Sequence, residues 1–418
     1  MGEALIFLGI LIFSAHLFSM IFSRKKIPDV LLLMIIGIII GPLLGLISPT
    51  FMGQAGGIFT TIVLVVILFD AGTDISIIDL KNAWKPTIRL SISSVIISTI
   101  LVGLIAYAIG FTLINSLIVG IILSGTSSAV VIPLTQQLKL GKDAKTSLIL
   151  ESAITDIICF VLALAFLESA QKGGGVDFGS LAGGVISSFV MATIIGFISA
   201  IVWASLLHKV RTVKNSMFLT PAYVFVVFGI SESLGFSGAI SALAVGVTIT
   251  NMDFFNFKFL EKYQKDKYLK QTDNEKAFIS EIVFILKTFF FVYIGISIPF
   301  NNIIALITGL GATLALLIMR VFIAKYYSPK SSNAYDKSII SLMIPKGLAA
   351  AVLASIPEQM GLPQGELIKS VVYATVLFSI LICSIAIFII GRYPKANVLL
   401  RIFFKTTKKT KIEKKIVS

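Results

Sequence analysis

The chain has 418 residues, of which 56% are hydrophobic and only 13% are charged. A soluble protein carries about 25% charged residues, and the mean hydropathy of this chain is +0.98. Such a chain cannot cover its surface with polar groups, which excludes a soluble enzyme, a nucleic-acid-binding module and a disordered protein. The two cysteines, Cys159 and Cys383, lie in apolar runs and indicate neither a disulfide framework nor a metal site.

Apolar stretches long enough to cross a bilayer, which takes about 20 residues, recur along the whole chain. Thirteen of them predict an all-α polytopic membrane protein. In chain order they cover 4–23, 28–47, 56–73, 88–110, 115–137, 146–167, 179–207, 216–234, 236–251, 278–298, 302–324, 338–357 and 367–390. No phosphate-binding glycine loop, nucleophile elbow or histidine cluster accompanies them, so we expect neither an enzyme nor a bound cofactor.

The basic residues lie in alternate loops between these spans. With the amino terminus outside, 30 of the 35 Lys and Arg residues fall in inside loops, and only Lys172 falls in an outside loop. This positive-inside pattern predicts an odd number of spans and a cytoplasmic carboxyl terminus, and it explains the net charge of +14 without nucleic acid. We expect a transmembrane domain over 1–390 in the cell membrane. A short basic tail over 391–418 would face anionic lipid.

Ionisable residues within the expected spans are informative, because charge at bilayer depth costs roughly 3 kcal/mol per residue. They are Asp70, Glu151, Asp156, Glu281, Lys287, Arg320 and Lys346. Acids and bases occur together, so mutual pairing is feasible. Lys287 is deep enough to need a partner, and pairing or snorkelling is a simpler role for it than transport chemistry.

The run 151–156, Glu-Ser-Ala-Ile-Thr-Asp, places two acids and two hydroxyls in the sixth span. Helical periodicity puts Ser152 and Asp156 on one face, and it puts Thr155 four residues after Glu151. Carboxylate, hydroxyl and backbone oxygens are ligands that suit a small hard cation. One acid must remain free of a buried base if the site is to exchange ions, and we expect that acid to be Asp156.

Two spans carry sequences that interrupt a helix. Residues 123–129 read LSGTSSA, and residues 344–347 read IPKG. At bilayer depth a broken helix is tolerated only where it lines a cavity in the protein, and its freed carbonyls can bind a cation. The small residues of 123–129 are equally typical of a close-packed helix interface. Because the two spans lie seven apart they run in opposite directions, which indicates an inverted-repeat secondary transporter.

These residues give the chain a resemblance to the monovalent cation:proton antiporter superfamily, and within it to the NhaP-type sodium/proton exchangers. The run 151–156 is similar to the family's Glu-Ser-x-x-Asn-Asp signature, and 124–129 to its unwound crossing segment. Residues 345–347, Pro-Lys-Gly, resemble its Pro-Arg-Gly motif. Arg320 matches a basic residue of the eleventh span, and 235–246 is similar to a further family pattern.

The resemblance implies an NhaA/NhaP-like fold of about 13 helices, in which two interrupted helices cross within an inverted repeat. It also implies a homodimer in which a core slides against a static dimerisation domain. Asp156 would bind cation and proton in turn, and Ser152 and the backbone around Thr126 would supply further ligands for Na⁺.

The resemblance also implies roles for the charges around this site. Glu151 would form an ion pair with Arg320 that orders the site, and Lys346 would sit on the second crossing helix. Thr155 stands where the family has asparagine, and Lys346 stands where it has arginine. These two departures leave the ion choice and the charge balance of transport open.

We therefore expect an antiporter that exchanges a monovalent cation, Na⁺ or Li⁺, for H⁺ by alternating access at Asp156, in a 1:1 electroneutral cycle. Burial disfavours the charged form of a carboxylate, so a proton and a cation compete for it. A K⁺/H⁺ antiporter is the main alternative; the lack of a regulatory domain in this sequence favours sodium. A cation channel would need a continuous polar path, and an organic-anion symporter would need a site without carboxylates.

Overall fold

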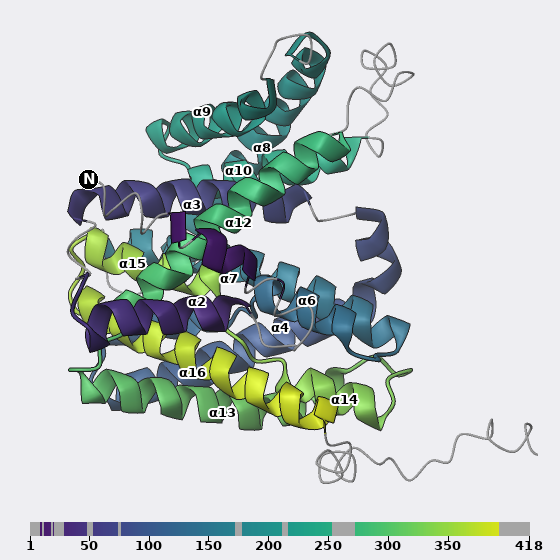
Figure 1. The fold of residues 1–418 in the computed structure, drawn as a ribbon. Helices are drawn as coiled ribbons and strands as arrows, with labels where there is room; N and C mark the ends of the chain where they lie inside the picture. The colour runs from purple at the N-terminus through teal and green to yellow at the C-terminus, as the bar shows by residue number, and fades with distance from the viewer. Residues whose placement is uncertain are drawn as a thin grey trace, which may run out of the picture.

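The computed structural model describes residues 9–10, 12–17, 20, 29–47, 53–73, 77–171, 178–210, 216–252 and 272–392. These residues form helices and connecting turns, without a strand among them (Figure 1). The helices are α2 (Asp29–Ile38) with the π-helical turn η1 (Ile39–Leu43), α3 (Gly53–Thr73), α4 (Ile77–Ala108), α5 (Leu113–Ile122), α6 (Ser128–Gln137), α7 (Lys142–Gln171), α8 (Phe178–Val210), the 3₁₀ turn η3 (Ser216–Phe218), α9 (Leu219–Ser233), α10 (Gly238–Thr250), α12 (Asp273–Ile296), α13 (Ile303–Tyr327), α14 (Ala334–Leu342), α15 (Leu348–Gln359) and α16 (Gly365–Arg392).

The helices follow the apolar stretches of the sequence. Six of those described are long and apolar enough to cross a bilayer, and five shorter apolar helices accompany them. The expected fifth span is the pair α5 and α6, and the expected twelfth is the pair α14 and α15, so both predicted interruptions are present. The first expected span, 4–23, lies largely outside the described residues, as does the tail beyond 392.

A turn separates the closely spaced eighth and ninth spans. Gly235 has φ +78°, a conformation that residues with a side chain rarely adopt. The backbone N–H of Phe236 donates to the Ser231 carbonyl oxygen (2.9 Å), which closes the end of α9. The Ser237 side chain accepts from the N–H of Ile240 and caps α10. The two spans are therefore distinct helices.

The packing of the first half of the chain repeats in the second half with the helices in the same order, as an inverted-topology repeat requires, which confirms the expected fold. Counted as spans, α2, α3, α4 and α7 correspond to α10, α12, α13 and α16. The contacts follow this correspondence, since α2 packs on α12 as α10 packs on α3, and α4 packs on α7 as α13 packs on α16. The helices α4 and α13 also pack on each other, so the two halves meet along them.

Glycines permit the closest of these helix crossings. A Cβ atom at Gly246 of α10 would lie 2.2 Å from the Phe69 carbonyl oxygen of α3, beside Gly72. The corresponding crossing of α2 and α12 has the same construction, because a Cβ at Gly295 would lie 2.2 Å from the Met34 carbonyl oxygen. Small residues of this kind let helix backbones approach where lipid supplies no hydrophobic driving force.

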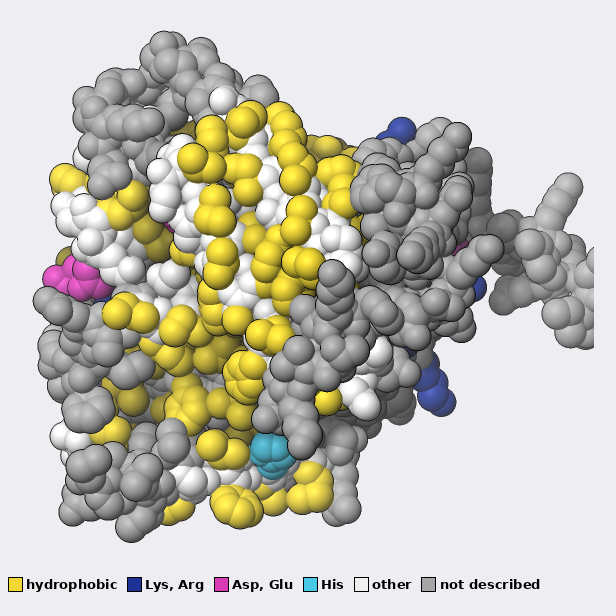
Figure 2. Space-filling model, turned by 90° about the horizontal axis from the view of Figure 1, so that it is seen from above, with side chains coloured by type: hydrophobic (Ala, Val, Ile, Leu, Met, Phe, Trp, Pro, Cys, Tyr) yellow, Lys and Arg dark blue, Asp and Glu magenta, His cyan; other side chains and the backbone are white. Residues whose placement is uncertain are grey.

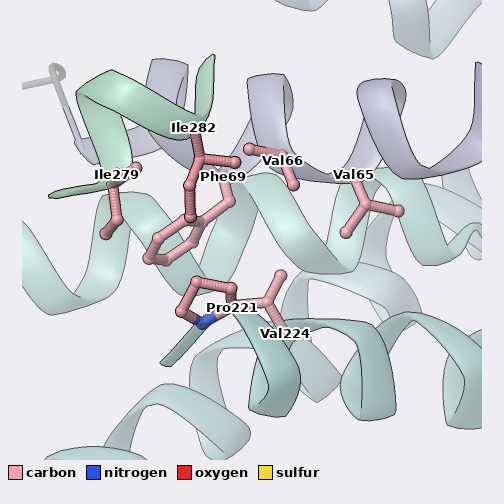
Figure 3. A pocket seen from close by; sticks show the side chains of 7 residues that line it. All are labelled: Val65, Val66, Phe69, Pro221, Val224, Ile279 and Ile282. Carbon is pink, nitrogen blue, oxygen red and sulfur yellow. The ribbon is translucent and has the colours of Figure 1, made fainter. Parts of the chain in front are cut away.

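The helices α8 and α9 lie at the top of Figure 1, away from α13 and α16 at the bottom. They share a second buried cluster with α3, α10 and α12, which includes Phe69, Trp203 and Val245. A small pocket lined only by apolar side chains marks where α3, α9 and α12 meet (Figure 3). Seen from above, this side of the molecule carries many apolar side chains and few charges among the described residues, as a lipid-facing surface does (Figure 2).

The glycine crossings lead to a prediction about stability. We expect Gly246→Ala to lower the stability of the protein in detergent by about 1–3 kcal/mol, because the added methyl group meets backbone atoms that cannot move aside. The matched control is Gly229→Ala on α9, where an added Cβ has no atom within 4 Å. Thermal unfolding of both variants checks this. Equal melting temperatures for the two would contradict the close crossing.

Candidate functional site

The two interrupted helices meet at their breaks. Between α5 and α6 the backbone is not helical over 123–127, and between α14 and α15 it is not helical over 343–347. The N–H of Ser127 donates to the Pro345 carbonyl oxygen at 2.8 Å, so each break satisfies a backbone group of the other. A Cβ at Gly347 would lie 2.0 Å from Ser127 Oγ, which explains the glycine after Lys346.

Glu151 of α7 and Arg320 of α13 form a buried, two-pronged ion pair. Arg320 Nη2 donates to Glu151 Oε2 at 2.5 Å, and Arg320 Nη1 donates to Glu151 Oε1. Two further hydrogen bonds hold the guanidinium, since Nη1 also donates to Ser94 Oγ at 3.0 Å and Nε donates to the Ile340 carbonyl oxygen at 3.1 Å. Glu151 is 1% exposed and Arg320 is 2% exposed. The carboxylate of Glu151 is thus neutralised in place.

Asp156 lies one turn and a half further along α7 and has a different environment. Its Oδ2 accepts from Ser128 Oγ at 3.0 Å and from the Ser128 backbone N–H at 3.4 Å, at the first residue of α6. A helix N-terminus stabilises a negative charge through its free N–H groups and dipole. Asp156 is partly exposed, unlike Glu151. Of these two acids, Asp156 is thus the one that is not fully enclosed by the protein.

The threonines predicted from the sequence contact each other where α7 meets the first break. Thr155 Oγ1 accepts from the Thr126 backbone N–H at 3.2 Å and shares a 3.0 Å hydrogen bond with the Thr126 hydroxyl. Gly125 packs against Asp156, since a Cβ there would lie 3.4 Å from Asp156 Oδ1. The Ser152 hydroxyl is buried and donates to the Ile149 carbonyl oxygen at 2.9 Å, within its own helix. The structure thus joins α7 to the first break through threonine oxygens.

The buried base nearest this group is Lys346, in the second break. Its Nζ donates to the Gly125 carbonyl oxygen at 2.8 Å, and its backbone N–H donates to Ser379 Oγ of α16 at 3.0 Å. The lysine is 2% exposed. Lys287 lies elsewhere, partly buried on α12, a helix that packs mainly on α2 and α3.

Three serines contact the charged residues described above but were not among the site residues predicted from the sequence. They are Ser94 beside Arg320, Ser128 beside Asp156 and Ser379 beside Lys346. A signal existed for the first, because Thr87, Ser91, Ser94 and Ser98 are all buried and recur at helical spacing on α4. Ser128 belongs to the 123–129 run, but nothing in the sequence distinguishes it from its neighbours.

The arrangement brings together one neutralised acid, one accessible acid and the breaks of two helices. A carboxylate surrounded by hydroxyl and carbonyl oxygens can bind a proton or a small hard cation. Lys346 adds a buried positive charge in the second break. The chemistry that this group supports is therefore reversible binding of small cations.

The ion pair can be tested by a double-mutant cycle. We expect Arg320→Ala and Glu151→Ala each to destabilise the protein by about 3–5 kcal/mol, because each leaves one buried charge without its partner. The double variant should be destabilised by less than the sum of the two. Unfolding in detergent measures all three. Strict additivity would show that the two side chains do not stabilise each other.

Known proteins resemble this chain in sequence and in fold. An uncharacterized Na⁺/H⁺ antiporter of Schizosaccharomyces pombe is 24% identical over 369 residues, covering 80% of this chain and 62% of its own length, so the present chain spans less than two thirds of that relative. The Na⁺/H⁺-K⁺ antiporter GerN of Bacillus cereus is 22% identical over 396 residues, which cover 93% of this chain and 97% of GerN. The solved structure of the sodium proton antiporter MjNhaP1 from Methanocaldococcus jannaschii superposes with a TM-score of 0.74 at 19% identity, over 91% of this chain and 98% of that one, and shares the fold. Residues 10–393 match the family described as sodium/hydrogen exchanger, transmembrane, and the chain is a multi-pass membrane protein that belongs to this family of cation/proton antiporters.

Proposed function

We propose that this protein exchanges Na⁺, or Li⁺, for H⁺ by alternating access at Asp156, with one cation moved for one proton. The observation that carries the proposal is the contrast between Glu151 and Asp156, which both lie on α7. Glu151 is buried and bound by both ends of the Arg320 guanidinium, whereas Asp156 is partly exposed and faces the break between α5 and α6. One carboxylate therefore remains to bind the transported ions.

The cation site proposed here consists of oxygens that surround Asp156. Asp156 supplies the charge, and the hydroxyls of Thr155 and Ser152 and the backbone around Thr126 supply neutral oxygens. Glu151 contributes indirectly in this scheme, because its pairing with Arg320 holds α7 in register with α13. Lys346 compensates charge at the crossing, where it holds the Gly125 carbonyl.

Competition between the two ions provides the coupling. An empty, charged carboxylate is costly to carry through a low-dielectric region. The site therefore changes the side to which it opens only when a proton or a cation has neutralised Asp156. Two ions that must use the same carboxylate in turn are exchanged for each other, and a leak of either one alone is suppressed.

Sodium is our proposal for the cation, and potassium is the competing one. The relatives support exchange of both kinds, because one is named a Na⁺/H⁺ antiporter and another a Na⁺/H⁺-K⁺ antiporter. We further propose that the protein works as a homodimer in the cell membrane with its carboxyl terminus in the cytoplasm. Proteoliposomes that enclose a pH-sensitive dye, given Na⁺, Li⁺ or K⁺ in turn, decide the ion. Proton flux with K⁺ alone would replace sodium by potassium in this proposal.

Asp156→Asn tests the site itself. The amide keeps the shape of the side chain but removes the charge that titrates, so we expect sodium-driven proton flux to fall to the level of empty liposomes while the protein still folds. The matched control is Glu366→Gln, the same change at an exposed acid in the first turn of α16. Sustained exchange by the Asp156 variant would remove this residue from the mechanism.

Membrane voltage tests the stoichiometry. If Asp156 alone loads a proton, each cycle moves no net charge, and sodium uptake into proteoliposomes should be unchanged when a potassium-diffusion potential of either sign is imposed. A clear acceleration at one sign would mean that a second proton moves. Lys346→Arg would then identify the carrier, since a buried lysine can release its proton and an arginine effectively cannot.

A further inference from the structure

A group of amide contacts joins the start of α5 to the loop after α15. Asn115 Nδ2 donates to the Pro363 carbonyl oxygen at 2.9 Å and to Gln364 Oε1 at 3.0 Å. The backbone N–H of Thr112 also donates to Gln364 Oε1 at 3.2 Å, and Gln364 Nε2 donates to the Gly110 carbonyl oxygen at 3.0 Å. We call this group the Asn115 clamp. Gln364 has φ +63°, a conformation that a non-glycine residue keeps only where its surroundings hold it.

A second group joins the start of α14 to the loop after α6. Asp336 is 2% exposed, and its Oδ1 accepts from the Gly141 backbone N–H at 3.0 Å. Its Oδ2 accepts from the N–H of Asn333 at 3.0 Å, which completes a capping box at the start of α14. Nearby, Ser331 Oγ donates to Asp143 Oδ2 at 2.5 Å. We call this group the Asp336 clamp.

The two clamps occupy corresponding places in the inverted repeat. Thr112 caps α5 and Asn333 caps α14, and in each case the residue three positions later, Asn115 or Asp336, reaches into the other half of the chain. Each clamp thus ties the free end of one short helix to the loop that follows the far half of the other interrupted helix. The crossing is held at its centre by Ser127 and Pro345 and at both ends by the clamps.

The short helices on either side of each break need contacts that hold their ends in place. The helices α5 and α6 have 10 residues each, and α14 has 9. Isolated helices shorter than about 12–15 residues are marginal in water. A break also removes the backbone hydrogen bonds that would hold the two halves of a helix in line. The backbone oxygens of the breaks must nevertheless stay where a cation can use them, because binding groups lose their effect when they are displaced by about 1 Å.

We propose that Asn115 and Asp336 are positioning residues of the exchanger. Neither touches the transported ion; each fixes one end of the crossing so that the oxygens of residues 123–127 keep their place beside Asp156. This inference rests on the proposed exchange at Asp156. It predicts that loss of a clamp weakens cation binding in a protein that still folds.

Removing one clamp at a time is the first test. We expect Asn115→Ala and Asp336→Ala to raise the sodium concentration for half-maximal exchange at least fivefold, with a smaller change in the maximal rate. Glu358→Gln is the control. It breaks a partly exposed ion pair between Glu358 and Lys369, which lies near the Asn115 clamp but is not part of it. Unchanged half-maximal concentrations in both folded alanine variants would overturn the proposal.

Replacing the Asp336 clamp by a covalent bond is the second test. A Cβ at Gly141 would lie 3.7 Å from Asp336 Cγ, so the side chains of Gly141→Cys and Asp336→Cys would lie close together, and oxidation of this double variant is used to form a disulfide between them. The native cysteines are buried and can remain. The oxidised double variant lacks the carboxylate but has the tie, so we expect it to fold and to recover a half-maximal concentration within twofold of the native protein.

The second test also covers the case in which Asp336→Ala does not fold. Exchange that stops on oxidation and returns on reduction would mean that this end of the crossing must open during transport, and would overturn the proposal. Absence of exchange in the unmodified protein itself would instead reject the proposed function, so the two failures are distinguishable.

Discussion

Within a bilayer a helix can break only where the protein itself supplies partners for the backbone groups that the break frees. Here two breaks supply partners for each other. The N–H of Ser127 is satisfied by the Pro345 carbonyl oxygen, and the Gly125 carbonyl oxygen is satisfied by the Lys346 ammonium group. The two interruptions therefore depend on each other for these partners.

The charges around the crossing divide into a structural pair and an accessible group. A buried ion pair is weak evidence for stability, because desolvation offsets much of the attraction. Its clearer effect is to fix geometry: Arg320 links α13 to α7, to Ser94 of α4 and to the carbonyl of Ile340 at the end of α14. Four elements from both halves of the chain are thereby held in register, and Asp156 takes no part in this ion pair.

The two halves of the chain share their backbone contacts at the breaks but differ in the charged residues there. Thr126 and Lys346 each lie two residues before the second half of an interrupted helix, and the backbone N–H of each donates to a hydroxyl, of Thr155 in one case and Ser379 in the other. The residue after Thr155 is Asp156, whereas the residue after Ser379 is Ile380. At these corresponding places one half thus carries the acid Asp156, and the other carries the base Lys346.

The membrane class, the helical spans and the two interruptions could be predicted from the sequence, because each depends on local composition and on neighbours within a few residues. Hydropathy over about 20 residues decides whether a segment can cross a bilayer, and glycine and proline, as at Gly125 and Pro345, lower the local preference for a helix. The spacing of Glu151 and Asp156 on one helix is likewise a local property. The eighth and ninth spans could be separated for the same reason, through Gly235.

Contacts between distant segments were decided only by the tertiary structure. Ser128, Ser379 and Ser94 are three serines among many in apolar stretches, and their importance arises because the fold brings them to Asp156, Lys346 and Arg320. The same holds for the clamps, since Asn115 and Asp336 reach partners that are 248 and 195 residues away in the chain. The sequence by itself determined which segments enter the membrane and which of them break, because those outcomes depend on solvation and local backbone preference. Which groups then satisfy one another depends on helix packing in three dimensions, which no local pattern encodes.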